Sequence, residues 1–83
     1  MVSVVFGLPL QALRLTRRTD GVQLSGHTHG CRVFLIFKHT GQVRCTIVRD
    51  TRTHATTLAE TSEAACTWAK DTLQAFSRVP VSA

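Results

Sequence analysis

Apolar and polar positions alternate most clearly between Cys31 and Arg49. The run C-R-V-F-L-I-F-K is followed by H-T-G and then by Q-V-R-C-T-I-V-R. Because β-branched and aromatic residues suit a pleated surface, the two long runs predict strands. A three-residue loop over 39–41, with Gly41 in the left-handed conformation, joins them into a hairpin. The apolar face of this hairpin then consists of Val33, Leu35, Phe37, Val43, Cys45 and Ile47.

Two further strands are predicted before this hairpin, over 11–18 and 22–27. Asp20-Gly21 between them is a strong signal for a two-residue hairpin turn, and it would pair Arg17 with Leu24. Helical spacing around residues 10–14 is the alternative, and the turn signal favours the strand. The expected apolar face of the pair consists of Leu13, Leu15, Val22 and Leu24.

A turn at His29-Gly30 would set Leu24 opposite Leu35 and align the apolar faces of the two hairpins. The four strands then form one antiparallel meander. Residues 1–9 alternate as well and end at Gly7 and Pro9, which predicts an extra edge strand or an exchanged arm.

An amphipathic helix is predicted in the C-terminal third of the chain. Residues 50–57 are a polar connection with a short further strand around 54–57 as an alternative. Thr57-x-x-Glu60 has the capping-box pattern and Leu58 begins the apolar stripe, although a start at Thr61 or Ser62 also fits. The helix is expected to span about 20 residues and to stop at Pro80, leaving a flexible tail over 79–83.

These elements predict a single α+β domain over residues 1–83, with the order ββββα and the helix packed on one face of the sheet. Since only one helix is available, the other sheet face is expected to be bare. Alternation makes that face basic at its margins and apolar at its centre. Its proposed binding residues are Arg14, Arg18, His27, Arg32, Phe34, Ile36, Lys38 and Arg44.

Composition narrows the function classes. The 83-residue chain has a formal net charge of +5, from eight Arg and two Lys against five acidic residues. Its three cysteines are an odd number without close spacing, which favours free thiols in a reducing cytoplasm. The apolar N-terminus has no preceding basic residues and no segment reaches membrane length, so neither secretion nor a membrane location is expected.

The bare face predicts a binding protein without catalytic activity. One hypothesis is an inhibitor or adaptor from a phage or mobile element that blocks a nuclease or another nucleic-acid-handling complex, as anti-CRISPR proteins do. Phe34 and Ile36 would then be buried anchors, with arginines at the rim. The alternative is direct binding of DNA or RNA, in which arginines neutralise phosphates and Phe34 stacks on a base. Homodimerisation through the same face is a further alternative.

In element order, the second half of the chain resembles the small sheet-plus-helix DNA-binding arms of phage integrases. The residues Thr61-Ser62-Glu63-Ala64 match their T-x-E-A-like helix start. The resemblance implies basic strands that enter a major groove.

Enzymatic and metal-binding functions have weaker support in the sequence. A small histidine-dependent ribonuclease is the third hypothesis, with candidates His27, His39 and His54, but no carboxylate stands at a spacing that would orient them. His27, His29 and Cys31 form H-x-H-x-C. A turn at 28–30 would break their alignment, so no metal site is expected there. No cofactor is expected either.

Overall fold

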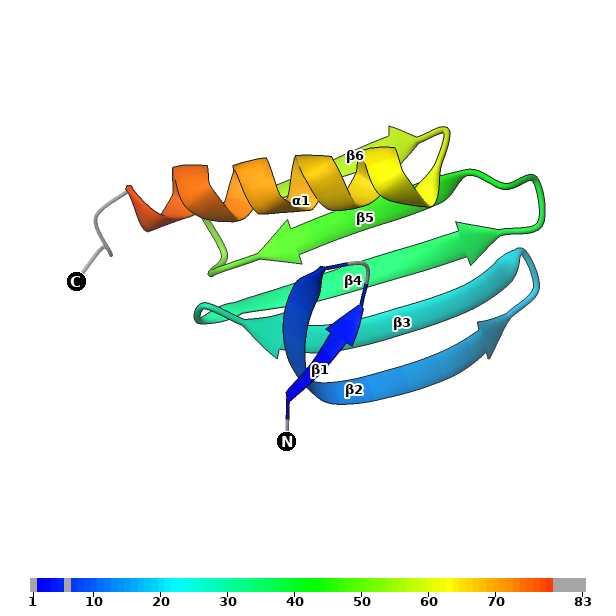
Figure 1. Cartoon of the computed structure of the whole chain (residues 1–83), viewed down its shortest axis with the longest axis horizontal. Coiled ribbons are helices and arrows are strands. Elements are labelled where there is room, and N and C mark those ends of the chain that lie inside the picture. The colour runs from blue at the N-terminus through cyan, green and yellow to red at the C-terminus, as the bar shows by residue number, and fades with distance from the viewer. Residues whose placement is uncertain (1, 6, 79–83) are drawn as a thin grey trace.

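A computed structural model describes residues 2–5 and 7–78 of the chain. It confirms an α+β fold in which an antiparallel meander is followed by one C-terminal helix (Figure 1). In the described part, six strands form one sheet in sequence order. The elements are β1 (Val2–Val5), β2 (Leu8–Arg18), β3 (Gly21–Thr28), β4 (Cys31–Lys38), β5 (Val43–Val48), β6 (His54–Ala59) and α1 (Ser62–Ser77).

The four predicted strands correspond to β2–β5, and the two additional strands lie at the edges of the sheet. The N-terminal segment was predicted as an edge strand or an exchanged arm, and β1 pairs with β2 as an edge strand. β6 covers the region where a short further strand was an alternative. The predicted stop at Pro80 and the tail 79–83 lie outside the described residues.

Two of the predicted turns are confirmed. In the loop over 39–41, the Gly41 N–H donates to the Lys38 carbonyl at 3.0 Å and Gly41 has a φ of +92°. The β3–β4 turn is His29-Gly30, with φ values of +50° and +75°, and it sets Leu24 opposite Leu35 as expected. Short local signals therefore determine the register across β3, β4 and β5.

The predicted Asp20-Gly21 turn is wrong by one residue. Arg18 pairs with Gly21, so the turn consists of Thr19 and Asp20, and Arg17 faces Val22. Gly21 belongs to β3, where it pairs with Arg18 and Lys38. The backbone of β4 passes very close to it, since a Cβ there would lie 1.9 Å from the Phe37 carbonyl oxygen. The partner of Arg17 shifts by two positions, so each side chain stays on its predicted face.

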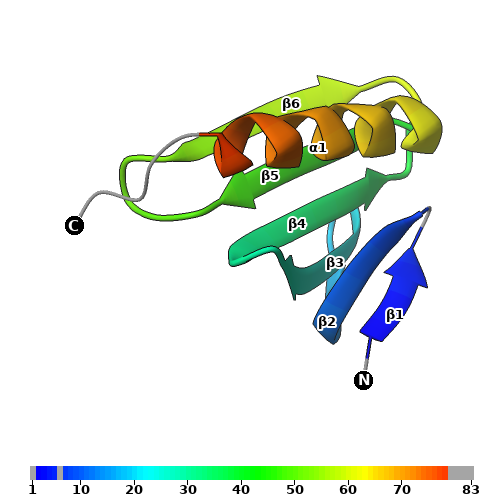
Figure 2. The same cartoon turned by 60° about the vertical axis from the view of Figure 1, so that its left-hand side comes forward.

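A β-bulge bends β2. The register shifts between Gln11 and Arg14, and Ala12 has a φ of +53°. A Cβ on Gly26 would lie 3.0 Å from Leu10 Cβ and 3.2 Å from Leu13 Cδ2, so both leucines lie over this glycine. Because a bulge sharpens the local twist, the start of β2 and all of β1 curl to the side of β4 that carries α1 (Figures 1 and 2).

The helix begins later than the capping-box pattern predicts. Thr61 is the N-cap, and its Oγ1 accepts a hydrogen bond from the Ala64 N–H at 3.1 Å. Thr57 and Leu58 instead pair with β5 inside β6. The alternative start at Thr61 or Ser62 is therefore confirmed, and the 16-residue helix is shorter than expected.

The core lies between α1 and the central strands. The helix packs over β5 and β6, and its buried residues are mostly small, which allows close approach. The start of β2 lies on the same side of the sheet as α1 and closes the core beside the helix with Leu8 and Leu10. The buried apolar residues are Leu8, Leu10, Cys31, Val33, Leu35, Val43, Cys45, Ile47, Ala65, Cys66, Ala69 and Leu73.

The predicted apolar face of β2 and β3 is only partly covered. Leu13, Val22 and Leu24 are half-buried, whereas Leu15 is 73% exposed. Leu15 lies on the core side, opposite Leu24, but α1 covers the β5–β6 half of the sheet and does not extend this far. The expectation that this face is buried is therefore wrong at Leu15.

Candidate binding face

The face of the sheet opposite α1, here called the open face, carries all eight residues proposed for binding. It is formed by the residues of β2–β6 that alternate with the core residues. Cross-strand pairing arranges them in rows: Gln11–His27–Arg32–Val48–His54, Arg14–Ser25–Phe34–Thr46–Thr56, Thr16–Gln23–Ile36–Arg44–Leu58, and Arg18–Gly21–Lys38.

Charge on the open face has one sign. Its rows contain four arginines and one lysine, and no aspartate or glutamate. The acidic residues lie outside these paired rows, in turns, in connections and on α1: Asp20, Asp50, Glu60, Glu63 and Asp71. A surface with segregated positive charge attracts anionic partners and steers their approach.

One end of the open face is partly neutralised. Arg18 Nε forms an ion pair with Asp20 Oδ1 at 3.1 Å, and its Nη1 donates to Gln23 Oε1 at 3.1 Å. The Arg18 hydrogen bond, assisted by the charge of Lys38, lowers the pKa of Asp20. Arg18 and Lys38 therefore contribute less free positive charge than the sequence suggests.

The remaining cations surround Phe34. The Arg32 guanidinium carbon lies 5.6 Å from the Phe34 ring centroid, within the range of a cation–π contact. Arg14 lies in the same row as Phe34, two strands away, and Arg44 pairs with the next residue along the face, Ile36. Among the described residues, none of these three arginines has an ion-pair partner.

The apolar centre is less open than alternation alone predicts. Phe34, Ile36 and Val48 are half-buried, and the Arg32 guanidinium lies over the Phe34 ring. Leu58 adds an apolar residue to this centre, although helical spacing predicts it in the apolar stripe of α1. It lies on β6 opposite Arg44 and is 40% exposed. The preceding Thr56-Thr57 pair, with its β-branched side chains, was the available strand signal.

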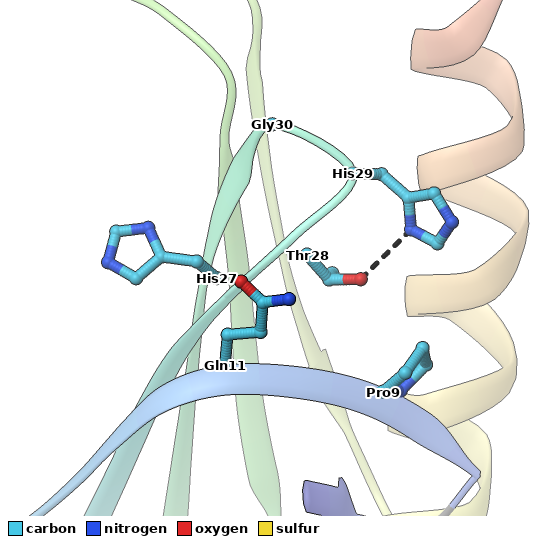
Figure 3. Close-up of a pocket in the computed structure, with 6 residues that line it drawn as sticks. All are labelled: Pro9, Gln11, His27, Thr28, His29 and Gly30. Atoms are coloured by element: carbon cyan, nitrogen blue, oxygen red, sulfur yellow. Dashed lines mark hydrogen bonds between the residues drawn. The ribbon is translucent and has the colours of Figure 1, made fainter. Parts of the chain in front are cut away.

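A pocket of about 430 Å³ lies at the end of the sheet where β3 turns into β4. Pro9 and Gln11 of β2 line it together with residues 27–30 (Figure 3). The imidazoles of His27 and His29 point to opposite sides of the turn, and His29 Nδ1 lies 2.9 Å from Thr28 Oγ1. The two rings therefore do not converge on one ligand.

The histidines named for a ribonuclease are not brought together. His27 lies on β3, His39 in the β4–β5 loop and His54 on β6. In the H-x-H-x-C segment, Cys31 is buried on the core side while His27 points to the open face. Within residues 2–5 and 7–78, no three His, Cys, Asp or Glu side chains cluster closely enough to hold a metal ion.

The cysteines are poor nucleophiles in the folded state. All three are free and buried. Burial, with a smaller contribution from Cys66, raises the pKa of Cys45 to about 12. The thiolate form that reacts in cysteine chemistry is therefore disfavoured at this position.

The raised pKa of Cys45 predicts alkaline destabilisation. In the unfolded chain the thiol ionises near its ordinary pKa of 9.0, whereas burial raises the pKa of the folded thiol to about 12. The contribution of the Cys45 thiol to the free energy of unfolding is therefore complete below pH 9 and falls by about 1.4 kcal/mol per pH unit between pH 9 and about 12. Thermal unfolding between pH 8 and 11 measures this loss. A Cys45→Ala variant should unfold at lower temperature and show a flatter pH dependence; an unchanged slope would contradict the assignment.

No helix in the described part of the chain is long and apolar enough to cross a membrane. Comparisons with protein-family models, with curated proteins and with solved structures found no match to this chain.

Proposed function

We propose that this chain is a small non-enzymatic binding protein that places its open face against the phosphate backbone of a nucleic acid. The observation that carries the proposal is the charge segregation: five cations and no carboxylate stand in the rows of the face. Phosphate contacts from arginine and lysine supply most of the non-specific affinity of such proteins. Arg14, Arg32 and Arg44 are the principal contacts, and Phe34 offers a stacking surface beside them.

A second candidate is an inhibitor or adaptor that docks on an acidic surface of a nucleic-acid-handling complex. The row Ile36–Arg44–Leu58 favours it, because an exposed leucine and a half-buried isoleucine flank an arginine. Apolar anchors with arginine at the rim are typical of protein interfaces. Such binding should weaken less steeply with salt than direct nucleic-acid binding, and it should be lost with Ile36→Asp or Phe34→Ala.

Salt dependence distinguishes the two candidates. Labelled single- and double-stranded DNA and RNA should bind the wild-type protein at low salt. With three phosphate contacts, the slope of log K against log salt is expected to be about −2.7 on duplex DNA, or roughly a 40-fold loss between 50 and 200 mM. The absence of binding at 50 mM salt, from protein shown to be folded, would exclude direct nucleic-acid binding.

Arg32→Glu should weaken nucleic-acid binding about tenfold or more and reduce the salt slope by about one. Arg17→Glu is the matched control, because Arg17 is an exposed arginine that pairs with Val22 on the opposite side of the sheet. Both variants lower the formal net charge from +5 to +3. A general charge effect would weaken both equally, and that result would show that the open face is not the binding surface.

A further inference from the structure

The strand β6 forms an edge of the sheet that lacks the usual protection. Its six residues pair with β5 without a bulge, and none of them is charged or proline. Native edge strands are normally blocked by such features, because their free N–H and C=O groups pair readily with another strand. At the opposite edge, β1 has only four residues.

We propose that two copies of this chain pair through β6 in antiparallel register, about a twofold axis at Thr56. In this register Thr56 pairs with Thr56 of the partner subunit, and His54 pairs with Leu58 of the partner subunit. Because alternate residues of a strand lie on the same face of a sheet, these side chains all lie on the open face. Beyond the two ends of this ladder, the same register brings Arg52, in the turn between β5 and β6, next to Glu60 of the partner subunit, which follows β6 directly. The twofold axis repeats this contact, so the edge is self-complementary in charge.

Local hydrogen bonds hold the backbone of Arg52 and the carboxylate of Glu60 in place. Asp50 Oδ1 accepts from the N–H groups of Arg52 and Thr53, each at 2.8 Å, and this fixes the chain as it enters β6. Gln42 Nε2 donates to Glu60 Oε1 at 3.2 Å, which leaves the second carboxylate oxygen for another donor. In the described part of the chain, neither Arg52 nor Glu60 has an ion-pair partner.

The position of α1 over β5 and β6 allows the two helices of the proposed dimer to pack against each other. The helix packs over β5 and β6 (Figure 2). Neighbouring strands lie about 4.8 Å apart, so a helix axis midway between β5 and β6 stands about 5 Å from the proposed twofold axis. The two helices would then lie about 10 Å apart, which is within the usual range for packed helices.

Trp68 lies on the side of α1 that would face the second helix. Lys70 and Leu73 line a pocket with Gly7 and Leu8, on the β2 side of the helix. At 100° per residue, Trp68 projects to the other side of the core stripe, toward the β6 edge. It is half-buried. The assembly would join the six strands described for each copy into a twelve-stranded sheet, with both open faces on one side.

Sedimentation equilibrium tests the pairing by charge exchange. The wild-type protein should be a dimer of about 18 kDa, twice the 9.1 kDa of the chain. Arg52→Glu or Glu60→Arg alone should raise the dimer dissociation constant at least tenfold, because each sets like charges opposite each other twice. The double variant Arg52→Glu/Glu60→Arg should return it to within about threefold of wild type. Dilution should shift the emission of the single tryptophan, Trp68, toward the red.

The control is Arg17→Glu, which makes the same charge change on an exposed residue of β2 and should leave the dimer unchanged. A monomeric wild-type protein at 100 µM would overturn the proposal, and so would a double variant that stays dissociated. The result is independent of the proposed function, because Arg32→Glu on the open face should affect nucleic-acid binding and not the dissociation constant of the dimer.

Discussion

Gly21→Ala is expected to destabilise the fold by about 4 kcal/mol or more, a large part of the 5–15 kcal/mol typical of a small domain. The new Cβ would lie 1.9 Å from the carbonyl oxygen of Phe37 and 2.8 Å from its carbonyl carbon. Both are backbone atoms of β4, so no side-chain rotation relieves the clash. The β3–β4 ladder has to separate at this point, and urea unfolding followed by circular dichroism measures the cost.

Gly41→Ala is the control for backbone conformation without a clash. Gly41 has a φ of +92°, and a Cβ there would meet no atom within 4 Å. The expected cost is about 1 kcal/mol, the usual penalty for a non-glycine residue in the left-handed region. Equal losses for the two variants would mean that Gly21 is needed only for its conformation and that β4 is not in close contact there.

The contrast between these glycines explains which turns the sequence could predict. Gly41 and Gly30 act locally, since each supplies a positive φ in a short turn, and both turns were predicted correctly. Gly21 also follows an aspartate and resembles a turn glycine. Its role depends on the carbonyl of Phe37, sixteen residues later in the chain. A nonlocal contact of this kind leaves no pattern in the adjacent residues.

The boundary between β6 and α1 shows the same limit. Thr57 and Glu60 fit a capping box, and Leu58 fits the apolar stripe that follows. Pairing of Thr57 with Cys45 and of Leu58 with Arg44 places both residues in a strand instead. The competing cap at Thr61 has an equally good local pattern, so the partner strand β5 decides between them.

The sequence predicts which residues lie on the open face, but it does not predict how their side chains contact one another. Alternation assigns each residue of β3, β4 and β5 to a face, and the bulge at Ala12 adds one residue before Arg14 without changing the face of the residues that follow. The neutralisation of Arg18 by Asp20 and the stacking of Arg32 over Phe34 depend on side-chain geometry. These contacts shift the centre of the proposed site toward Arg14, Arg32 and Arg44.

Leu35→Ala is expected to cost about 3 kcal/mol, within the range for deleting a buried leucine side chain. Leu35 is 1% exposed and lies between Leu24 and Cys45 in the middle of the core face. Surrounding strands hold the site in shape, so the cavity cannot collapse fully. Urea unfolding at constant m-value measures the loss.

Leu15→Ala makes the same chemical change on the same face of the sheet and should cost less than about 1 kcal/mol. Leu15 pairs with Leu24, yet it is 73% exposed because α1 covers the other half of this face. The pair of variants therefore separates the apolar pattern, which both residues share, from burial, which only Leu35 has. A loss at Leu15 as large as that at Leu35 would show that the apolar surface of β2 is buried in solution and that another element or a partner covers Leu15.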